Sequence, residues 1–546
     1  MGPDFRRILL ATAASVAILI GWQLLFPPKR QPPAPPPPPP AETTRTAPSP
    51  SGQPLRAPVA PAVPAPPPNA PEETVRLAGS GLEAVLSSHG GAVKSLVLVG
   101  DKFRRELESG EAVQIDLVRT TKEQPYLLAL VPSPELGGAQ DLAADPAARA
   151  PMRIVSRDAQ GVVFEGRVGN VDVRKAYRLT GKPFELALDI EVSGAQPGGA
   201  VALLFPGHTP PNAKKGGPFS GPPLDVVRPV CRAGDKTERY DLGGDPGAEK
   251  LAGQVSWAGV DVGYFIAAAL PKEPLGACVL ARGPEKGIGL AALRVPLEGT
   301  AKKISLTVYA GPKDLDILRS YGRAFDAAID YGAMARPFAF FSRILLYVMR
   351  WFERIVANWG VAIILLTVLV KLLLYPLTAK SMQSMNAMRK LQPEIEKLKQ
   401  KFGADREKLN QATMQLYQKH KVNPLGGCLP MLLQLPIWFA LYATLQTSVE
   451  LYRAPFLWMH DLTRHDPYFI LPLAMGASSF LMQKISPQPA DSSQAKMMLY
   501  FMPIFFTALM LFVPGGLTLY IFVNNVLSIA QQQYLMKRQA VTAKAA

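Results

Sequence analysis

Apolar and polar residues alternate with a period of two through residues 72–310 of this chain. A period of two with one polar face is typical of antiparallel strands, and clusters of Gly and Pro between the runs mark turns. We therefore expect a large all-β sandwich, followed by a helix over 313–330 with Leu315, Leu318 and Phe325 on one side. The apolar members of the alternating runs are Phe184, Leu186, Leu188, Ile190 and Val192; Val113, Ile115 and Leu117; and Ile304, Leu306 and Val308.

Two segments of different character precede this region. Ile8–Phe26 is apolar, follows two arginines and is long enough to cross the hydrocarbon of a membrane. A cleaved signal peptide would need small residues after the apolar stretch, but bulky residues stand there. We therefore expect a retained transmembrane anchor over 1–26. Residues 27–71 contain 20 of the 54 prolines, which predicts a semi-rigid tether, since proline has a fixed φ and no amide donor.

Helical spacing begins after the predicted sandwich, at residues 332–357. A narrow apolar stripe faces one way and four arginines face the other way. Such an amphipathic helix lies in the membrane interface, with guanidinium groups at the lipid phosphates. The alternative is a helix packed on the sandwich. The stripe consists of Phe338, Phe341, Leu345, Val348, Phe352 and Ile355, and the arginines are Arg336, Arg343, Arg350 and Arg354.

Long apolar runs in the last part of the chain predict membrane spans. Three runs cover 359–377, 428–446 and 468–484. A longer run, 497–533, is interrupted by Pro514-Gly515-Gly516, which predicts a hairpin of two spans. Together with the N-terminal anchor, these runs predict a polytopic α-helical membrane protein with six transmembrane helices.

Composition and charge agree with a membrane protein and give its expected orientation. Charged residues make up only 19%, hydrophobic residues 48%, and the formal net charge is +16, which excludes a disordered chain and disfavours a cytosolic enzyme. Residues 378–427 carry ten Lys/Arg and four acidic residues, whereas 447–467 carry two Lys/Arg. Positive loops face the cytoplasm. We therefore expect 378–427 and both termini inside, and the tether and sandwich outside.

Residues that carry covalent chemistry are sparse. The five histidines are scattered, and no pattern for a nucleophile, a phosphate loop or a metal site occurs. We therefore predict no catalytic residues, no metal and no cofactor. Cys231 and Cys278 lie in the expected outer domain, where a disulfide between them is one possibility and free thiols are the other.

Polar residues recur at one depth in three of the predicted spans. Lys371, Gln434 and Asn525 each lie six residues from the expected cytoplasmic end of their span. Polar groups in hydrocarbon are costly unless they meet each other or water, so a hydrated, positively charged cavity open to the cytoplasm is predicted. For Lys371 alone, snorkelling to the interface is the alternative. Further polar residues in the same set are Thr367, Asn524 and Ser528.

Residues 378–427 are predicted to form a basic helical hairpin. Its first helix carries a stripe of methionines and other apolar residues, and its second helix begins near residue 405. Methionine stripes occur on adaptable surfaces that hold varied apolar segments, but contact between the two hairpin helices would explain the stripe equally well. The residues concerned are Met382, Met385, Met388, Lys397, Lys399 and Lys401.

A set of short motifs resembles the YidC/Oxa/Alb family of membrane protein insertases. The motifs follow one another in order over 358–535, and the anchor, tether and β domain before them resemble the Gram-negative bacterial form. The stretches are Tyr375-Pro-Leu-Thr378, Leu391-Gln-Pro-Glu-Ile395, Asn423-Pro-Leu-Gly-Gly-Cys428, Leu435-Pro-Ile-Trp-Phe-Ala-Leu-Tyr442, Gly516-Leu-Thr-Leu-Tyr520, Asn524-Asn525 and Gln531-Gln-Gln533.

The resemblance implies a five-helix insertase core and a periplasmic β-supersandwich without catalysis. It implies a function in inserting and folding newly made proteins of the inner membrane, alone or with the Sec translocon, and partners that include ribosomes and anionic lipids. The groove residue that attracts acidic client segments is usually Arg, and Lys371 stands at that position. The family often has an aromatic residue at the position of Ile521, and we include its neighbour Tyr520 in the expected groove.

Two other classes of function remain open from the sequence. A transporter or channel would need a continuous path, which an apolar outer leaflet does not favour. A sugar-acting enzyme in the sandwich would need converging histidines and carboxylates, and only His89 and His208 are available there.

Overall fold

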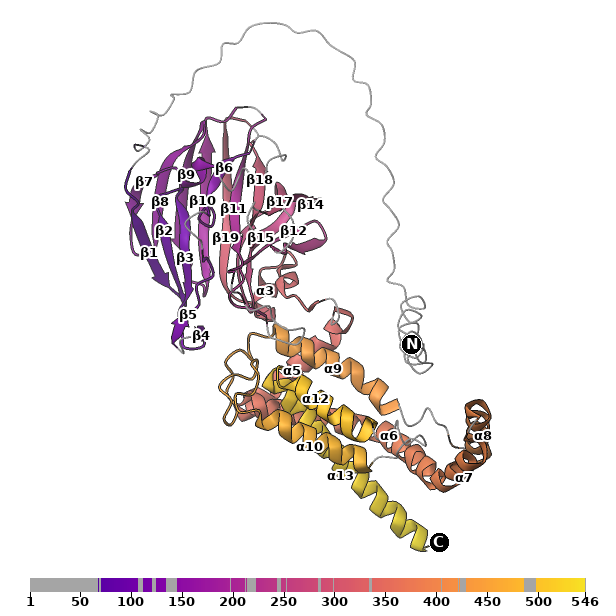
Figure 1. Cartoon of the computed structure of the whole chain (residues 1–546). Coiled ribbons are helices and arrows are strands. Elements are labelled where there is room, and N and C mark those ends of the chain that lie inside the picture. The colour runs from indigo at the N-terminus through magenta and orange to yellow at the C-terminus, as the bar shows by residue number, and fades with distance from the viewer. Residues whose placement is uncertain are drawn as a thin grey trace, which may run out of the picture. The chain divides into compact units, whose positions relative to one another are not determined.

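A computed structural model describes most of the chain from residue 70 onward (Figure 1). Residues 63–546 form one compact unit. The predicted anchor, and the tether except for residues 67, 70 and 71, lie outside the described residues. The described residues are 67, 70–106, 111–119, 124–133, 145–196, 198–211, 213, 222–242, 247–251, 253–282, 286–297, 299–332, 336–403, 405–420, 422, 429–485 and 497–545.

Antiparallel sheets make up the first half of the described chain, as the period of two predicts. The largest sheet has nine strands. In spatial order they are β13 (Lys236–Arg239), β12 (Arg228–Ala233), β15 (Val255–Val262), β16 (Phe265–Pro271), β19 (Ala301–Pro312), β10 (Glu185–Ser193), β9 (Val171–Leu179), β8 (Gly161–Val168) and β7 (Arg153–Arg157).

Three smaller sheets accompany the nine-stranded sheet. The five-stranded sheet contains β14 (Gly247–Leu251), β17 (Ala277–Arg282), β18 (Ile288–Pro296), β11 (Ala200–His208) and β6 (Leu130–Pro132). The other two sheets are β1 (Thr74–Gly79), β2 (Leu82–Ser87) and β3 (Ala92–Leu98), and β4 (Arg104–Glu106) with β5 (Ala112–Gln114). A short 3₁₀ helix, η1 (Pro146–Arg149), precedes β7.

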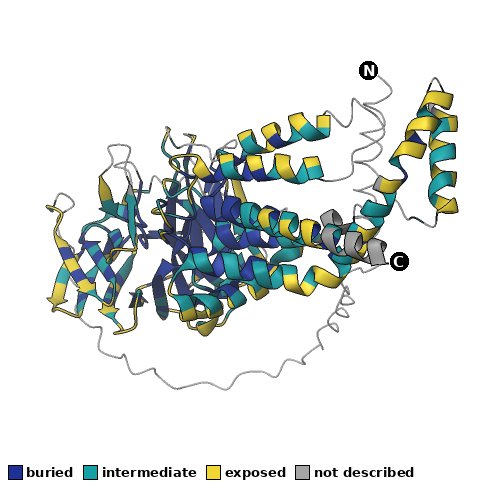
Figure 2. Cartoon of the chain, turned by 90° about the horizontal axis from the view of Figure 1, so that it is seen from below, coloured by how far each residue is buried: buried dark blue, intermediate teal, exposed yellow. Residues whose placement is uncertain are grey.

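The main core lies between the two larger sheets, in the dark blue region of Figure 2. Leu186, Leu188, Ile190 and Val192 of β10 are all buried, which confirms the predicted alternation for these four residues. Phe184, the first residue of the predicted run, precedes the strand at positive φ and is half-buried. Residues of the five-stranded sheet such as Leu293 belong to the same apolar cluster. The region is therefore a β-sandwich.

A disulfide connects the two larger sheets, and this settles the question that the sequence left open. Cys231 of β12 in the nine-stranded sheet is bonded to Cys278 of β17 in the five-stranded sheet. Both residues are fully buried in the main core. The bond closes a loop of 47 residues across the sandwich.

The helix predicted over 313–330 is wrong as one continuous element. The structure has a short helix α3 (Leu315–Ser320) and a 3₁₀ helix η2 (Phe325–Ala328). Residues 322–324 adopt positive φ and end the first helix. The predicted inward side is nevertheless correct, because Leu315, Leu318 and Phe325 are buried against the outer face of the nine-stranded sheet beside Trp257.

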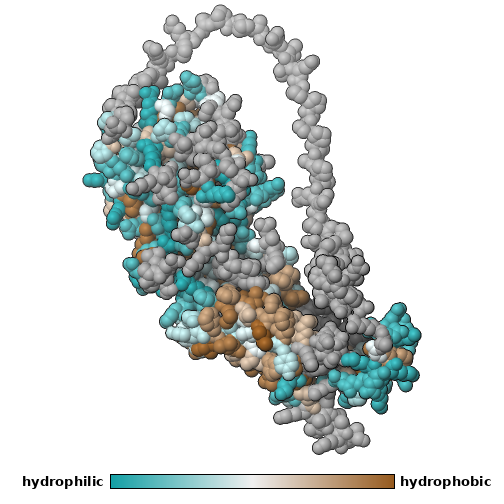
Figure 3. Space-filling view, viewed as in Figure 1, coloured by the Kyte–Doolittle hydropathy of each residue, from teal (hydrophilic) through white to brown (hydrophobic). Residues whose placement is uncertain are grey.

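The second half of the described chain is helical. Figure 3 shows a brown, apolar surface over these helices and a teal, hydrophilic surface over α7 and α8. The elements are η3 (Arg336–Phe338), α5 (Ala339–Val356), α6 (Trp359–Lys390), α7 (Gln392–Phe402), α8 (Arg406–Lys419), α9 (Leu429–Thr447), α10 (Ile470–Ile485), the π-helical turn η5 (Met497–Phe501), α12 (Met502–Met510) and α13 (Gly515–Ala545).

Several predicted spans correspond to helices in the structure. Among the described residues, one helix has the length and apolar composition to cross a membrane, Trp359–Met388, and 470–485 and 497–510 are shorter apolar helices. The run 497–533 is interrupted as predicted, because α12 ends at Met510 and α13 begins at Gly515.

The predicted start of the hairpin is wrong. Helix α6 continues through Pro376 to Lys390, and the chain breaks at Leu391 before α7 begins. A proline near the start of α7 explains this break, since it cannot continue the preceding hydrogen-bond ladder. Met382, Met385 and Met388 therefore all belong to α6 and not to the first helix of the hairpin; the side chain of Met385 lies outside the described residues.

Candidate functional site

The side chain of Lys371 connects α6 to α13 within the helical part. Its Nζ donates a hydrogen bond of 2.7 Å to Oγ of Ser528. Ser528 in turn donates to the main-chain oxygen of Asn524, one turn earlier on α13, at 2.7 Å. Lys371 is half-buried, and in the described part of the chain no carboxylate acts on its ammonium. The site therefore holds a positive charge inside an apolar helix bundle.

Tyr520, Asn524 and Ser528 lie on one side of α13, because residues four apart share a helix face. Tyr520 is almost fully buried and accepts a hydrogen bond from Nε2 of Gln434 on α9. Thr367 lies one turn before Lys371 on α6, is buried, and donates to the main-chain oxygen of Ile363 at 2.7 Å. Helices α6, α9 and α13 thus contribute polar side chains to one region.

Asn525 does not belong to this set, contrary to the prediction. Its Nδ2 donates to Ser478 Oγ at 3.2 Å and to Ser479 Oγ at 2.8 Å, both on α10. One residue along a helix is a rotation of about 100°, so the residue after Asn524 faces a different neighbour. The sequence predicts Asn525 beside Lys371 only from its depth in the membrane. Depth does not show toward which neighbouring helix a residue faces. Asn525 therefore fixes α13 to α10.

A second polar contact was missed from the sequence. Gln531 Nε2 donates to Thr378 Oγ1 at 2.8 Å, which connects α13 to α6 beyond Lys371. Gln532 Nε2 donates to the main-chain oxygen of Ile485 at 3.2 Å. The motifs that carry the family resemblance contain Thr378, Gln531 and Gln532, and this membership is the signal by which the sequence could have indicated these contacts.

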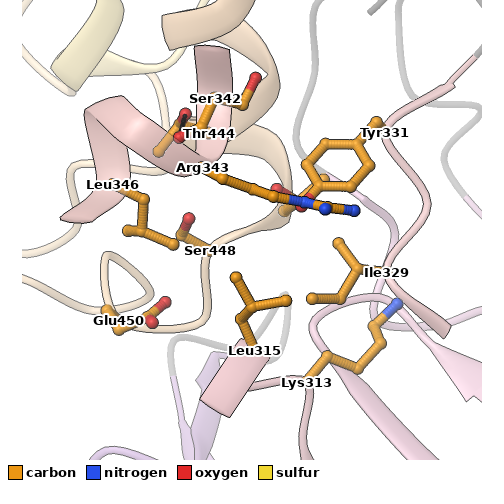
Figure 4. A pocket seen from close by; sticks show the side chains of 11 residues that line it. Lys313, Leu315, Ile329, Tyr331, Ser342, Arg343, Leu346, Thr444, Ser448 and Glu450 are labelled. Atoms are coloured by element: carbon orange, nitrogen blue, oxygen red, sulfur yellow. Dashed lines mark hydrogen bonds between the residues drawn. The ribbon is translucent and has the colours of Figure 1, made fainter. Parts of the chain in front are cut away.

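The arginines of α5 do not all face lipid, contrary to the prediction. Arg350 forms ion pairs with Asp314, at 3.0 Å, with Asp316 and with Glu450. The side chain of Arg343 extends toward Tyr331 in a small cavity (Figure 4). That cavity measures about 10 Å³, the space of a single water, so it holds no larger ligand.

The remaining features of α5 match an interfacial helix. Arg354 is exposed, and the side chain of Arg336 lies outside the described residues. Large apolar side chains are also exposed along the helix, and Tyr347 reaches 76%. The other side of α5 packs mainly against α6 and α9, whereas Arg350 is paired with the segment after the sandwich, at Asp314 and Asp316. The exposed residues Phe340, Phe341, Ile344, Tyr347, Trp351 and Ile355 form an apolar surface.

Helices α7 and α8 lie side by side beyond the end of α6 (Figure 1). Leu391 and Ile395 are buried. Lys397 and Lys401 are exposed, and Lys399 is half-buried. The Lys401 ammonium lies 5.2 Å from the centroid of the Phe402 ring. The hairpin thus presents lysines on its surface.

The chemistry of these residues is that of hydrogen bonding and charge. Within the described residues, no group of three His, Cys, Asp or Glu side chains is placed to hold a metal ion. The Lys371 region offers an ammonium, hydroxyls and amides, which bind polar segments of a polypeptide but supply no nucleophile with an adjacent base.

Comparisons with known proteins cover both halves of the chain. Residues 74–348 match the family model described as YidC periplasmic domain, and residues 351–543 match the one described as 60Kd inner membrane protein. A membrane protein insertase YidC from Anaeromyxobacter dehalogenans (strain 2CP-C) is 70% identical over 99% of this chain and 98% of its own length. One from Geobacter metallireducens is 33% identical over 97% of this chain and 98% of its own length.

Solved structures show weaker similarity. A YidC insertase crystal structure with its first transmembrane domain resolved is 17% identical, with a TM-score of 0.37, over 84% of this chain and 92% of the other. A putative aldose 1-epimerase from Escherichia coli K12 is 11% identical, with a TM-score of 0.27, over 44% of this chain and 99% of the other.

The two family models and the full-length relatives define the class first: a bacterial inner-membrane protein with a periplasmic β domain. Within that class, the chain belongs to the YidC family of membrane protein insertases. This is a family of insertases and not of enzymes, as the resemblance in the sequence implied.

Proposed function

We propose that this protein inserts newly made proteins into the inner membrane through a polar groove lined by α6, α9 and α13 and open to the cytoplasm. The observation that supports this most directly is the ammonium of Lys371, half-buried among apolar helices without a carboxylate partner in the described chain. A buried charge is costly unless it meets an opposite charge or water, and an acidic segment of a client supplies the opposite charge. The same proposed groove is lined by Thr367, Gln434, Tyr520, Asn524 and Ser528.

The proposed membrane arrangement has six spans. The anchor 1–26 is followed by α6, α9 and α10, then by 497–510, and finally by α13. Residues 27–335 face the periplasm together with 447–467, and 378–427, 484–496 and both termini face the cytoplasm. The excess of Lys/Arg in 378–427 supports this orientation.

The domain arrangement we propose follows the same division. Residues 27–71 are a periplasmic tether, 72–331 a supersandwich with helical turns at its end, and 332–357 an interfacial helix. The insertase core is 358–546. We propose that it works alone or with the Sec translocon, receives clients from ribosomes, acts as a chaperone for their folding, and contacts anionic lipids through its basic surfaces.

Reconstitution of the full chain into liposomes tests the proposed function. A client with an acidic translocated tail is synthesised in the presence of these liposomes, and its tail should become protected from external protease. Empty liposomes and liposomes with Lys371→Glu protein are the controls. Equal protection in all three preparations would overturn the proposal.

Two further measurements separate the rival classes and test the orientation. A channel would release a small ion from the same liposomes in the absence of a client, and the insertase predicts no such flux.

Membrane-impermeant thiol reagents applied to cells from outside should label cysteines placed in 447–467 and spare those placed in 378–427. The reverse labelling would invert the proposed orientation.

A further inference from the structure

A cavity of about 210 Å³ lies beside the loop that connects α9 to α10, far along the chain from Lys371. It is formed by the loop and by one residue of β4. Most of its charged lining is basic. The titratable side chains are Arg104, Arg453, Arg464, His460, His465 and Asp461.

The single carboxylate of this cavity already has partners. Asp461 Oδ1 accepts hydrogen bonds from the main-chain nitrogen and from Oγ1 of Thr463, at 2.8 and 2.7 Å. Asp461 Oδ2 lies 3.8 Å from Nε of Arg464. Three guanidinium groups and two imidazoles face this one acid, so the cavity has a net positive charge. A guanidinium binds phosphate oxygens through paired N–H groups, which makes an anion with several oxygens the matching ligand.

Hydrogen bonds to the sandwich fix the geometry of the cavity. Tyr452 donates from its hydroxyl to the main-chain oxygen of Arg104 at 2.6 Å, and Arg453 Nη1 donates to the same oxygen at 3.2 Å. In the part of the chain that the structure describes, Arg104 forms an ion pair with the exposed Asp101 at 3.2 Å. A pair at the surface is worth ~1 kcal/mol or less, so it competes weakly with a bound anion.

Exposed apolar side chains flank the basic cavity. Leu457 is 73% exposed and precedes His460 by three residues. Tyr468 is 67% exposed and follows Pro467, which lines the cavity, and Phe469 and Ile470 lead into the apolar helix α10. Aromatic and apolar side chains next to basic ones are typical of the boundary between lipid chains and headgroups. A soluble anion alone would not require this border.

We propose that this cavity binds the phosphate of an anionic phospholipid, with phosphatidylglycerol chemistry, in the periplasmic leaflet. The leaflet rests on the orientation proposed above, whereas the binding itself does not. One water occupies about 10–15 Å³ on this measure of volume, so the cavity accommodates a phosphate together with a small polar headgroup. The lipid chains would extend along Leu457 and Tyr468. The bound lipid would join the 447–467 loop, the sandwich and the membrane.

Binding to the full-length protein in a non-ionic detergent tests this site. The probes are short-chain phosphatidylglycerol, short-chain phosphatidylcholine and inorganic phosphate, titrated separately by calorimetry. Phosphatidylglycerol should bind most tightly. Arg453→Gln and Arg464→Gln should each weaken it at least fivefold, and Arg157→Gln, at an exposed arginine of β7 in the sandwich, is the matched control that should leave it unchanged.

Each alternative outcome has a distinct meaning. Equal affinity of wild type and both loop variants for phosphatidylglycerol would overturn the site. Inorganic phosphate binding as tightly as phosphatidylglycerol would replace the lipid by a free anion and overturn the lipid assignment. If Arg453→Gln lowers the unfolding temperature of the protein, His465→Gln, at an exposed side chain, replaces it in the comparison of phosphatidylglycerol affinity with wild type. Because detergent binding involves neither insertion nor orientation, its failure is distinguishable from failure of the proposed function.

Discussion

Lys371 and Ser528 are 157 residues apart in the chain, and the ammonium of one donates to the hydroxyl of the other at 2.7 Å. A lysine has three N–H donors, so Ser528 uses one and two remain for a client carboxylate. The Ser528 hydroxyl donates its own hydrogen bond to the main-chain oxygen of Asn524, which orients the hydroxyl lone pairs toward Lys371. This contact holds the Lys371 ammonium beside α13, where the proposed groove would place it.

This geometry predicts the effects of changing Lys371. Lys371→Ala should slow insertion of clients with acidic translocated tails roughly tenfold, the effect of ~1.4 kcal/mol, because attraction across low dielectric is lost. Lys371→Glu should be worse, and Lys371→Arg should retain activity because the charge remains. Insertion of paired clients that differ only in tail charge measures the effect.

Clients with neutral tails are the internal control and should be affected little by all three changes. Ser528→Ala should give a smaller loss with the same preference for acidic clients, because the ammonium stays but its position is less fixed. Equal insertion of the acidic client by Lys371→Glu and wild type would contradict the electrostatic model and favour snorkelling.

Arg350 should be important for the junction between α5 and the sandwich. Its guanidinium pairs with Glu450, whose side chain is 13% exposed, and burial raises the pKa of that carboxyl although Arg350 lowers it. Removing one partner of a buried pair costs roughly 3–5 kcal/mol. Arg350→Gln should therefore increase hydrogen exchange of the 447–467 loop.

The matched control for Arg350 is Arg354→Gln, an exposed arginine one turn along the same helix. It should leave exchange of the loop unchanged. The double variant Arg350→Gln with Glu450→Gln should recover part of the protection, since it removes the unpaired charge as well. If Arg350→Gln and Arg354→Gln exchange alike, the ion pairs contribute nothing to the junction.

The sequence predicts well which residues share a face of a strand or helix, and poorly which other element that face contacts. Alternation in β10 required only a count of two, and Leu186, Leu188, Ile190 and Val192 are buried as expected. Glu185, expected on the polar face, is also buried and accepts a hydrogen bond from Tyr321, a neighbour that the count does not contain. In α5 the helical period predicts that the arginines share one side, but which element Arg350 faces depends on Asp314 and Glu450, distant in the chain. Asn525 and its neighbour Asn524 face different helices for the same reason, because the position of α10 is set by tertiary packing. The end of α3 depends on backbone angles at 322–324 that the pattern does not contain.

A close helix crossing gives a further prediction. A Cβ on Gly476 of α10 would lie 2.1 Å from Oγ1 of Thr507 on α12. Alanine favours a helix over glycine by ~1 kcal/mol, but overpacking costs ~1–3 kcal/mol and should prevail. Gly476→Ala should lower the thermal unfolding temperature in detergent, and adding Thr507→Ala should restore most of it. An unchanged or higher unfolding temperature for Gly476→Ala would show that the two helices separate easily.

The hairpin should bind ribosomes through charge. Changing Lys397, Lys399 and Lys401 to Gln should reduce co-sedimentation with ribosomes at low salt, because the lysine surface no longer meets phosphate. Wild-type binding should itself fall as salt rises. Glu394→Gln with Glu396→Gln is the control and should bind at least as well as wild type. Co-sedimentation that survives removal of 392–419 would exclude this role of the hairpin.

The buried Lys175 in the sandwich predicts how stability depends on pH. Its Nζ donates to the main-chain oxygens of Gly90, at 2.8 Å, and Leu128, at 2.7 Å, and complete burial lowers its pKa to about 7. Above that pH the folded state has released a proton that the unfolded state retains to its ordinary pKa of about 10.4. Stability should therefore rise from pH 7 to 9, by at most ~1.4 kcal/mol per pH unit. Tyr177 lies in the same region, but burial raises its pKa, so it does not titrate in this window.

Urea unfolding of the full-length protein at pH 7, 8 and 9 measures this slope, with Trp257, buried on the outer face of the nine-stranded sheet, as a fluorescent reporter of the β domain. Lys175→Met should abolish the rise, whatever its effect on stability at pH 7, because it removes the group that titrates. Lys182→Met, at a side chain 72% exposed, is the control and should keep the rise. A slope that is the same in Lys175→Met and wild type would mean that another group causes it and that Lys175 remains charged through its carbonyl hydrogen bonds.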